Sequence, residues 1–281
     1  MPPEWFFQVF TMSDDVLYEV RGPKTLFEMT RPEVEELLKH TETVVIPVGS
    51  TEQHGTHLPL GSDTMQGDDM AKRLIKKFAD NGVAITATPT FPFGISDAHM
   101  KFPGSITISS RTLMTVLTEV VQSLYHHGFR KFVLLLSHGG NLPTLRLLAN
   151  DLVLEYPDIK VIVPDWIPIN SAAYPQILNS SRPNDEHHSG EGETARMLAY
   201  TPKLVDMANA ESYYMEPIMD PYQRKPYPGS VSTATSGLTV KEMTPYGVMG
   251  SPLKATAEAG NKLYEVITDW LYKVMKYEFD L

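Results

Sequence analysis

Short apolar runs alternate along this chain with longer stretches that have helical periodicity. The runs at 43–48, 83–88, 131–136 and 159–163 predict β-strands, because they are short and rich in β-branched residues. Between them, apolar residues recur at intervals of three and four, the spacing of one helix face. Strands that alternate with helices predict an α/β fold with a mostly parallel sheet covered by helices on both faces.

The predicted helices differ in how clearly their ends are marked. The ranges are 70–80, which Asn81 and Gly82 end, 113–124 with an end at Gly128, 142–155, a short one around Met197 and Leu198, and 253–277. Asn141 is a plausible N-cap for the third of these helices.

Two stretches interrupt the alternation. Residues 179–192 are polar and have no periodic apolar face, and residues 213–250 hold five prolines, which are Pro217, Pro221, Pro226, Pro228 and Pro245. Loops this long in a compact domain usually serve a function or an interface. No repeat, low-complexity tract or linker divides the chain, so we expect one domain over 1–281.

Composition and charge exclude several classes of protein. The 42% hydrophobic content is typical of a globular chain, and no apolar run approaches the ~20 residues of a membrane span. A formal net charge of −10 argues against nucleic acid or an anionic membrane as a partner. The chain has no cysteine, which excludes disulfides and thiolate nucleophiles, and it begins without the pattern of a signal peptide. We therefore expect a cytoplasmic protein that acts on a small molecule.

The first candidate chemistry follows the strand at 43–48. Glu52 and His54 are two residues apart, so in an extended segment their side chains point the same way. Glycines at 55 and 61 let the backbone turn, and Asp63 can then return to the same point. Imidazole and carboxylate ligands together suit zinc, manganese or ferrous iron. The alternative is a hydrophilic loop with a capping aspartate.

A second cluster, at 137–141, follows the strand at 131–136. His138 stands at the carboxyl end of that strand, where ligands bind in open parallel sheets. The adjacent glycines allow close approach to a ligand, and the following helix N-terminus favours anionic groups. A phosphate cradle or a simple turn with a buried histidine remains the alternative here.

The third cluster, at 187–194, leads into the short helix. His188 is followed five residues later by Glu193, a pair that can supply a proton shuttle and a ligand. Glu191 and Glu193 could instead be an acidic helix N-terminus that offsets the helix dipole.

The distribution of histidines favours the metal interpretation. Six of the nine histidines lie in or beside glycine-rich junctions, namely His54, His57, His99, His138, His187 and His188. The others are explained by a helix C-terminus or by surface exposure. The clustering of six histidines at these junctions predicts a metal site.

Taken in order, these motifs resemble the creatininase (creatinine amidohydrolase) family. The matching segments are Glu52-x-His54-Gly55 with His57-Leu58-Pro59 and Asp63, Gly94-x-Ser96-x-x-His99 with Phe102-Pro103-Gly104, His138-Gly139-Gly140-Asn141, His188-x-Gly190-x-x-Glu193-Thr194 and Gly247-Val248-Met249-Gly250. The resemblance covers roughly Val44 to the C-terminus. It implies a creatininase-like three-layer α/β fold, two divalent cations per chain and commonly a homohexamer.

The resemblance also implies roles for individual residues. One cation would be held by Glu52, Asp63 and His138, and Asp63 would bridge to a second cation. In creatininase the last carboxylate lies two residues after the turn histidine, where this chain has Gly140. Glu193 is therefore assigned to the second cation together with His54, and to the catalytic pair together with His188, the proton shuttle. Zn²⁺ is the expected metal, with Mn²⁺ or Fe²⁺ as alternatives.

The loop that precedes His187 indicates what kind of substrate to expect. Creatininase has a tryptophan beside its catalytic histidine, whereas residues 180–186 here are polar and contain none. Such a wall suits a hydroxylated or charged ligand. The expected activity is hydrolysis of an amide or similar carbonyl bond in a small polar, cyclic substrate. The alternative within the family is cleavage of a C–C bond in an inositol-derived cyclic diketone, the reaction of 3-dehydro-scyllo-inosose hydrolase.

Two other classes remain open at this point. A serine hydrolase could use Ser137 or Ser189, although the Gly-x-Ser-x-Gly elbow is absent. A non-catalytic binding protein would require that the ligand residues had been lost, and they are present.

Overall fold

The computed structural model describes residues 20–214 and 239–281. Its sheet has four parallel strands in the order β2-β1-β3-β4. The strands are β1 (Thr43–Val48), β2 (Thr86–Ala87), β3 (Lys131–Leu136) and β4 (Lys160–Ile162). In this register Val44 lies opposite Thr86 on one side and Phe132 on the other.

Helices connect the strands and cover the sheet. They are α2 (Arg31–Leu37), α3 (Ser62–Asp80), α4 (Ser110–His126), α5 (Leu142–Glu155), α6 (Ile167–Ile177), α7 (Glu191–Tyr200), α9 (Val240–Met243) and α10 (Ala257–Phe279). Within the described ranges, no helix is long and apolar enough to cross a membrane.

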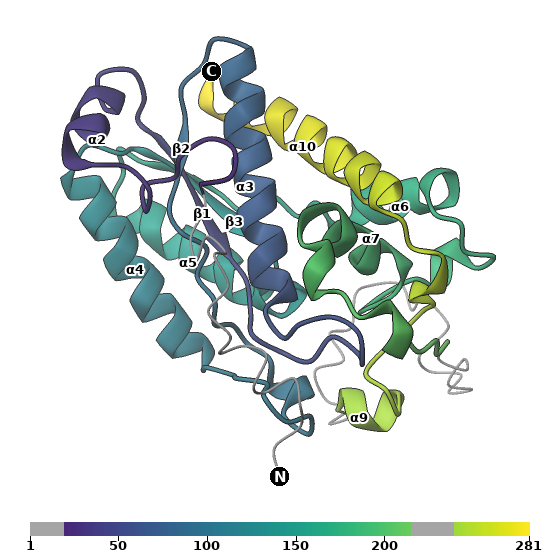
Figure 1. Ribbon diagram of the computed structural model, residues 1–281. Helices are drawn as coiled ribbons and strands as arrows, with labels where there is room; N and C mark the ends of the chain where they lie inside the picture. The colour runs from purple at the N-terminus through teal and green to yellow at the C-terminus, as the bar shows by residue number, and fades with distance from the viewer. Residues whose placement is uncertain (1–19, 215–238) are drawn as a thin grey trace, which may run out of the picture.

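The sheet divides the core into two halves. Val44, Ile46 and Val48 of β1 are buried on the side of α4 and α5, whereas Val45 is buried on the side of α3 and α10. Successive side chains along a strand point to opposite faces of the sheet. Because helices cover both faces, side chains on either face pack into an apolar layer. Figure 1 shows the resulting three layers, with α4 and α5 on one side of the strands and α3 and α10 on the other. The predicted fold class is confirmed.

Several predicted boundaries were wrong. β2 contains two residues instead of six. Val83 N–H still bonds to Phe78 of the preceding turn, and beyond Thr88 the backbone bonds to β1 again only at Phe91, whose N–H donates to Pro47. β4 is shorter by one residue at each end. The last helix begins at Ala257, after a 3₁₀ turn at 252–254, because the hydroxyl of Thr256 accepts from Ala259 N–H and caps it.

Asn141 does not cap α5. Its backbone is helical, and its side chain instead accepts from Ile95 N–H and donates to the carbonyl of Gly49. It therefore ties the ends of two strands together. The helices α2 and α6 were not predicted; α6 is obscured in the sequence by Pro168 and Pro175.

The fold places the candidate residues at one edge of the sheet. β1 and β3 are parallel neighbours, so the segments that follow Val48 and Leu136 leave the sheet at the same edge. Of the long proline-containing stretch, Pro245 lies in the described part, whereas Pro217, Pro221, Pro226 and Pro228 lie outside the described residues.

Candidate metal centre

The residues predicted as ligands converge in space. Two groups of three each place their ligand atoms within 4.8 Å of one another: Glu52, Asp63 and His138 form one, and His54, Asp63 and Glu193 form the other. Asp63 belongs to both. A cavity of about 280 Å³ reaches Glu52, Asp63, His138 and Glu193. The structure thus brings together all five proposed ligands, although they come from four segments of the chain.

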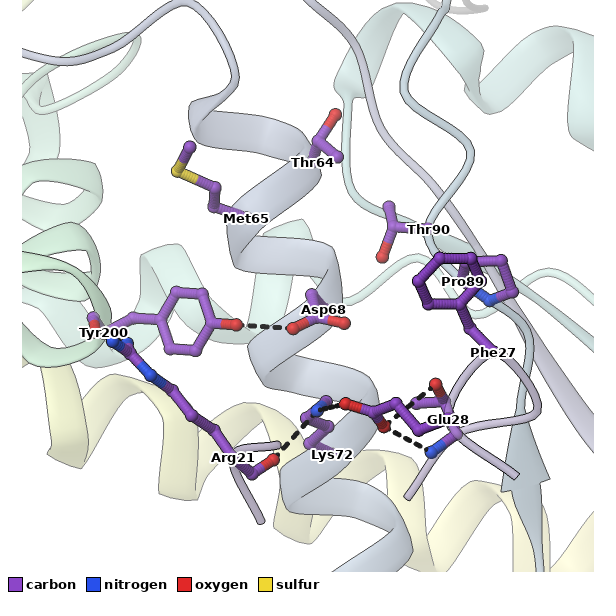
Figure 2. Close-up of a pocket in the computed structure, with 11 residues that line it drawn as sticks. Arg21, Phe27, Glu28, Thr64, Met65, Asp68, Lys72, Pro89, Thr90 and Tyr200 are labelled. Atoms are coloured by element: carbon purple, nitrogen blue, oxygen red, sulfur yellow. Dashed lines mark hydrogen bonds and ion pairs between the residues drawn. The ribbon is translucent and has the colours of Figure 1, made fainter. Parts of the chain in front are cut away.

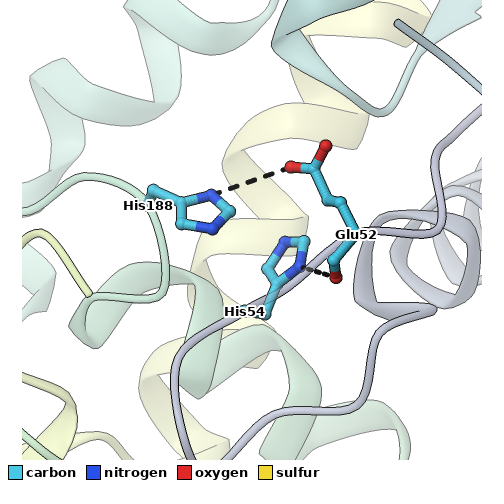
Figure 3. Close-up of side chains that lie close together, drawn as sticks. All are labelled: Glu52, His54 and His188. Carbon is cyan, nitrogen blue, oxygen red and sulfur yellow. Dashed lines mark hydrogen bonds and ion pairs between the residues drawn. The ribbon is translucent and has the colours of Figure 1, made fainter. Parts of the chain in front are cut away.

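His54 presents one ring nitrogen to the carboxylates. Its Nδ1 lies 3.1 Å from the backbone oxygen of Glu52, a contact drawn in Figure 3. A carbonyl oxygen only accepts, so Nδ1 carries the hydrogen, and Nε2 is left to face Asp63 at 3.2 Å and Glu193 at 3.8 Å. Metal-binding histidines are commonly oriented in this way by a hydrogen bond from the other nitrogen.

His138 is oriented by the same device. Its Nε2 donates to the carbonyl of Ile95 at 2.9 Å, and its Nδ1 faces Asp63 at 3.0 Å and Glu52 at 3.4 Å. A side chain at Gly140 would intrude on this contact, since a Cβ there would lie 2.5 Å from both His138 Nε2 and the Ile95 oxygen. In this conformation position 140 cannot carry a carboxylate, so a second group of ligands must draw its carboxylate from elsewhere, and Glu193 is in place.

Asp63 occupies the first turn of α3. Its Oδ2 accepts from Ser50 Oγ at 2.7 Å, and the side chain is almost completely buried. The helix N-terminus favours the ionised form. His54 and His138 outweigh the opposing effect of burial and hold the pKa of Asp63 well below its usual range.

The carboxylates and histidines of the cluster shift one another's pKa values. Burial and the neighbouring Asp63 raise the pKa of Glu52, and Glu52 Oε2 is buried without a hydrogen-bond partner. Burial alone would lower the pKa of His54, but Asp63, Glu193 and Glu52 raise it to about 10; similarly the pKa of His138 is raised to about 9 against burial, chiefly by Asp63. The two histidines thus hold protons among carboxylates, at positions that cations could take instead.

His188 lies beside this cluster. Its Nε2 donates to the carbonyl of Gln53 at 2.8 Å, and its Nδ1 lies 3.9 Å from Glu52 Oε1, as Figure 3 shows. Burial and the adjacent His54 lower the pKa of His188 to about 4 in the metal-free protein. Glu52, His54 and His188 also form a third group with metal-ligand spacing, so geometry alone permits His188 either role.

His99 belongs to the cluster although the sequence argument gave it no role. Its Nε2 lies 3.4 Å from Glu52 Oε1, and its Nδ1 contacts the Gln53 amide at 3.0 Å. The centre of its ring lies 4.8 Å from that of His188, with the two rings tilted by 55°. The Gly94-x-Ser96-x-x-His99 motif was the available signal. His57, by contrast, lies outside the groups and contacts the Thr194 hydroxyl at 2.8 Å.

Glu191 is more than an acidic residue at a helix N-terminus. It is fully buried, and its Oε1 accepts from the backbone N–H of Asn179 at 2.7 Å. Burial raises its pKa. The side chain therefore holds the start of the polar loop against α7, and it takes no part in the three ligand groups.

Glu186 holds the loop around His188 in place. Its carboxylate accepts four hydrogen bonds of 2.7–3.0 Å, from the backbone N–H groups of Glu191 and Ser251 and from the hydroxyls of Ser180 and Tyr214. Three separated segments of the chain thus meet at one buried carboxylate.

We expect Glu186→Gln to destabilise the protein and lower its activity. The Gln oxygen can still accept from the two backbone N–H groups, but its NH2 group makes the Ser180 and Tyr214 hydroxyls turn and accept. Loss of the hydrogen bonds to a charged group should cost roughly 1–3 kcal/mol. Thermal unfolding and kcat measure the two effects. Asp185→Asn is the matched control, because its carboxylate is exposed and its pair with Arg182 contributes at most ~1 kcal/mol. If Glu186→Gln and Asp185→Asn have equal melting temperatures and equal kcat, Glu186 does not hold the loop of His188 in place.

The serine alternatives do not fit the geometry. The Ser137 hydroxyl donates to the backbone oxygen of Asp63, and the Ser189 hydroxyl is buried without a hydrogen-bond partner. Neither serine has a histidine as its base among the hydrogen bonds of the described residues.

Part of the cavity wall comes from α6 and the residue before it. Trp166, Ile167, Asn170 and Tyr174 line the cavity, so a tryptophan does border the site, although it lies outside the loop 180–186. The sequence argument looked only at 180–186 and therefore missed it.

The chain resembles known proteins over most of its length. The creatininase family model, described as creatinine amidohydrolase, matches residues 27–275. A mycofactocin precursor peptide peptidase of Mycobacterium tuberculosis is 27% identical over 83% of this chain and 84% of its own. A 3-dehydro-scyllo-inosose hydrolase of Thermotoga maritima is 25% identical, with 88% and 81% covered, and a creatinine amidohydrolase of Pseudomonas putida is 26% identical, with 90% and 96% covered.

Solved structures share the fold. A creatininase-like protein from Bacteroides fragilis superposes with a TM-score of 0.77 at 26% identity, covering 92% of this chain and 97% of that one. A manganese form of creatininase gives 0.73 at 22% identity, with 91% and 99% covered. A creatininase variant of Zn-Zn type gives 0.69 at 23% identity, with 92% and 99% covered.

Proposed function

Because the chain belongs to the creatininase family, whose members are hydrolases, we propose that it is a metal-dependent hydrolase that cleaves an amide or similar carbonyl bond in a small polar substrate. The observation that carries this proposal is the pair of three-residue groups that share Asp63 at one cavity. Creatininases with manganese and with zinc are known among the structures of this fold.

The residues fit two divalent cations. Glu52, Asp63 and His138 would hold one, and His54, Asp63 and Glu193 the other. Imidazole nitrogens and carboxylate oxygens in this mixture suit Zn²⁺ first, with Mn²⁺ and Fe²⁺ as alternatives. Such cations, when bound, lower the pKa of water toward 7 and polarise a carbonyl oxygen.

His188 supplies the proton transfer in this proposal. Its Nε2–H is held by the Gln53 carbonyl, which leaves Nδ1 as the atom that faces the cavity. Nδ1 would first accept a proton from the attacking water and then pass it to the nitrogen or carbon that leaves. The buried Glu186 carboxylate keeps the loop of His188 in this position, and α6 forms part of the cavity wall.

A substrate screen with metal-loaded protein tests the proposal. The panel contains cyclic amides, formamides and short peptides, each assayed with and without a chelator. Chelator-sensitive release of an amine or acid from at least one class supports it. The absence of any such release, from protein with a full complement of metal, would refute an amide hydrolase.

The second candidate is cleavage of a C–C bond in an inositol-derived cyclic diketone. It is favoured by the similarity to the inosose hydrolase of Thermotoga maritima and by the polar loop 180–186. Adding inositol-derived ketones to the same panel distinguishes it, because it consumes a ketone without releasing an amine.

We further propose that residues 1–281 form one hydrolase domain and that the protein is cytoplasmic. A homohexamer, common in the family, is the proposed assembly, and light scattering in solution tests it.

Removal of metal should lower the melting temperature by about 10 °C. Cations that bind only the folded chain stabilise it by ~4 kcal/mol at a thousandfold excess over Kd, and each kcal/mol is worth roughly 2–4 °C at this chain length. Scanning fluorimetry with and without a strong chelator, then with added Zn²⁺ or Mn²⁺, measures the loss and its recovery.

The same stabilisation should grow with pH. His54 and His138 have pKa values raised to about 10 and about 9, so both must lose a proton before they can bind a cation. Metal therefore competes less well with protons at pH 6.5 than at pH 8.5. Melting curves that respond to neither chelator nor pH in this way would count against the site.

A further inference from the structure

One end of the cavity is closed by polar side chains that the proposed metal centre does not use. They are Gln66 of α3, Asn170 and Tyr174 of α6, and Arg196 of α7, and none is more than 6% exposed. Arg196 Nε donates to Gln66 Oε1 at 2.6 Å, and its guanidinium lies 5.5 Å from the centre of the Trp166 ring. Asn170 Nδ2 donates to the Tyr174 hydroxyl at 3.0 Å.

The charge of Arg196 has no ionic partner here. Among residues 20–214 and 239–281, no carboxylate lies within ion-pair distance of its guanidinium, and its Nη1 has no hydrogen-bond partner. Asn170 Oδ1 is a second buried atom without a partner at the same end. A buried cation without an ion pair is unfavourable, and the groups that hold Arg196 most directly, the Gln66 amide and Tyr174, carry no carboxylate.

Burial would lower the pKa of Arg196, but Tyr174 and the charge of Glu193 raise it. Glu193 nevertheless forms no ion pair with the guanidinium. It lies three residues before Arg196 on α7, so the two share a helix face. Its Oε2 is engaged elsewhere, accepting from Ser189 N–H at 2.7 Å and facing His54 at 3.8 Å. In the proposed metal-loaded enzyme the charge of Glu193 would also be shared with a cation, which would weaken its effect on Arg196.

A second cavity shows the contrast. This cavity of about 350 Å³ beside α3 also holds charged groups, as Figure 2 shows. There Lys72 Nζ donates to Glu28 at 2.7 Å, and Asp68 accepts from the Tyr200 hydroxyl. Lys72 is thus paired with a carboxylate and Asp68 has a hydrogen-bond donor, whereas Arg196 Nη1 has no partner.

We propose that Arg196 binds a carboxylate of the substrate, so that the enzyme acts on carboxylate-bearing amides such as N-acyl amino acids or short peptides with a free C-terminus. The inference rests on the proposed hydrolase function. The planar guanidinium matches a carboxylate with two parallel donors. The Asn170 oxygen offers an acceptor for a donor group of the same substrate.

The test compares ligands that differ only in this charge. N-formylglycine and N-formylglycinamide are the substrates, and succinate and succinamide are ligands that are not hydrolysed. Wild-type protein should have a lower KM or Kd for each acid than for the corresponding amide. Arg196→Met should lose roughly 10- to 100-fold with the acid, through KM or Kd, the range of a hydrogen bond to a charged group. Arg196→Met should leave KM or Kd for the corresponding amide unchanged. Arg111→Met, at an exposed arginine of α4, should change neither the value for the acid nor that for the amide.

Gln66→Glu is a second variant, which tests the proposal even if Arg196→Met does not fold. It places a carboxylate 2.6 Å from Arg196 Nε with almost no change of shape, so the preference for acids should disappear in a folded protein. The proposal is overturned if wild type binds succinate no better than succinamide, if Arg196→Met weakens acid and amide equally, or if Gln66→Glu keeps the preference. If the protein hydrolyses no substrate, the proposed hydrolase function fails. The carboxylate subsite is still tested, because calorimetry measures the binding of succinate and succinamide without hydrolysis.

Discussion

Asp63→Ala is expected to abolish hydrolysis and to lower bound metal below one ion per chain. Asp63 is the one residue shared by both ligand groups, and its two oxygens face different histidines, His54 at 3.2 Å and His138 at 3.0 Å. Its removal therefore weakens both proposed cation sites at once. Because metal assistance is worth several kcal/mol of transition-state stabilisation, we expect a loss of at least about 10³-fold in kcat/KM.

Elemental analysis and steady-state kinetics on the same preparation check this prediction. Asp63→Asn keeps the shape of the side chain and should lose metal as well, which separates ligand loss from a packing defect. Asp80→Asn, at the exposed end of the same helix, is the control and should retain both metal and activity. A full complement of metal in both Asp63 variants would remove the bridging role.

The second large effect separates a proton shuttle from a ligand. His188→Ala should lower kcat by ~10²-fold or more while metal content stays intact, the magnitude typical of a positioned acid–base group. Glu193→Gln should instead lose about one of the two proposed ions per chain, because its Oε2 faces His54 in the second group. Metal analysis and single-turnover rates on the two variants distinguish these outcomes.

Glu191→Gln is the matched control for this pair. Its Oε1 holds Asn179 and faces no ligand group, and the amide oxygen of Gln can still accept that hydrogen bond. Metal content should be unchanged. If His188→Ala loses metal while Glu193→Gln keeps it, the group of Glu52, His54 and His188 is the second site, and the proton must travel by another residue.

Local spacing was sufficient to find most of the proposed ligands. Glu52 and His54 are two apart after a strand, and His138 follows the neighbouring strand, so parallel pairing alone predicts that they meet. The core strands and the long helices were predicted for a similar reason, since burial of a strand or a helix face leaves a period in the sequence. Ends set by caps, prolines or tertiary hydrogen bonds leave a weaker trace, as β2 and α10 show.

Only the tertiary structure decided which atoms face the cavity. Backbone carbonyls of Glu52, Ile95 and Gln53 orient the rings of His54, His138 and His188, and no side-chain pattern records where a carbonyl will point.

The cavity wall was equally hidden in the sequence. His99 reaches it from a 3₁₀ turn, Trp166 from the residue before α6 and Arg196 from α7, and Glu193 meets His54 across 139 positions of the chain. Sequence periodicity reports whether a face is buried, not against which face it packs. The candidate ligands could therefore be predicted from the sequence, whereas the orientation of the ring nitrogens and the unpartnered Nη1 of Arg196 arise from packing between elements that are distant along the chain.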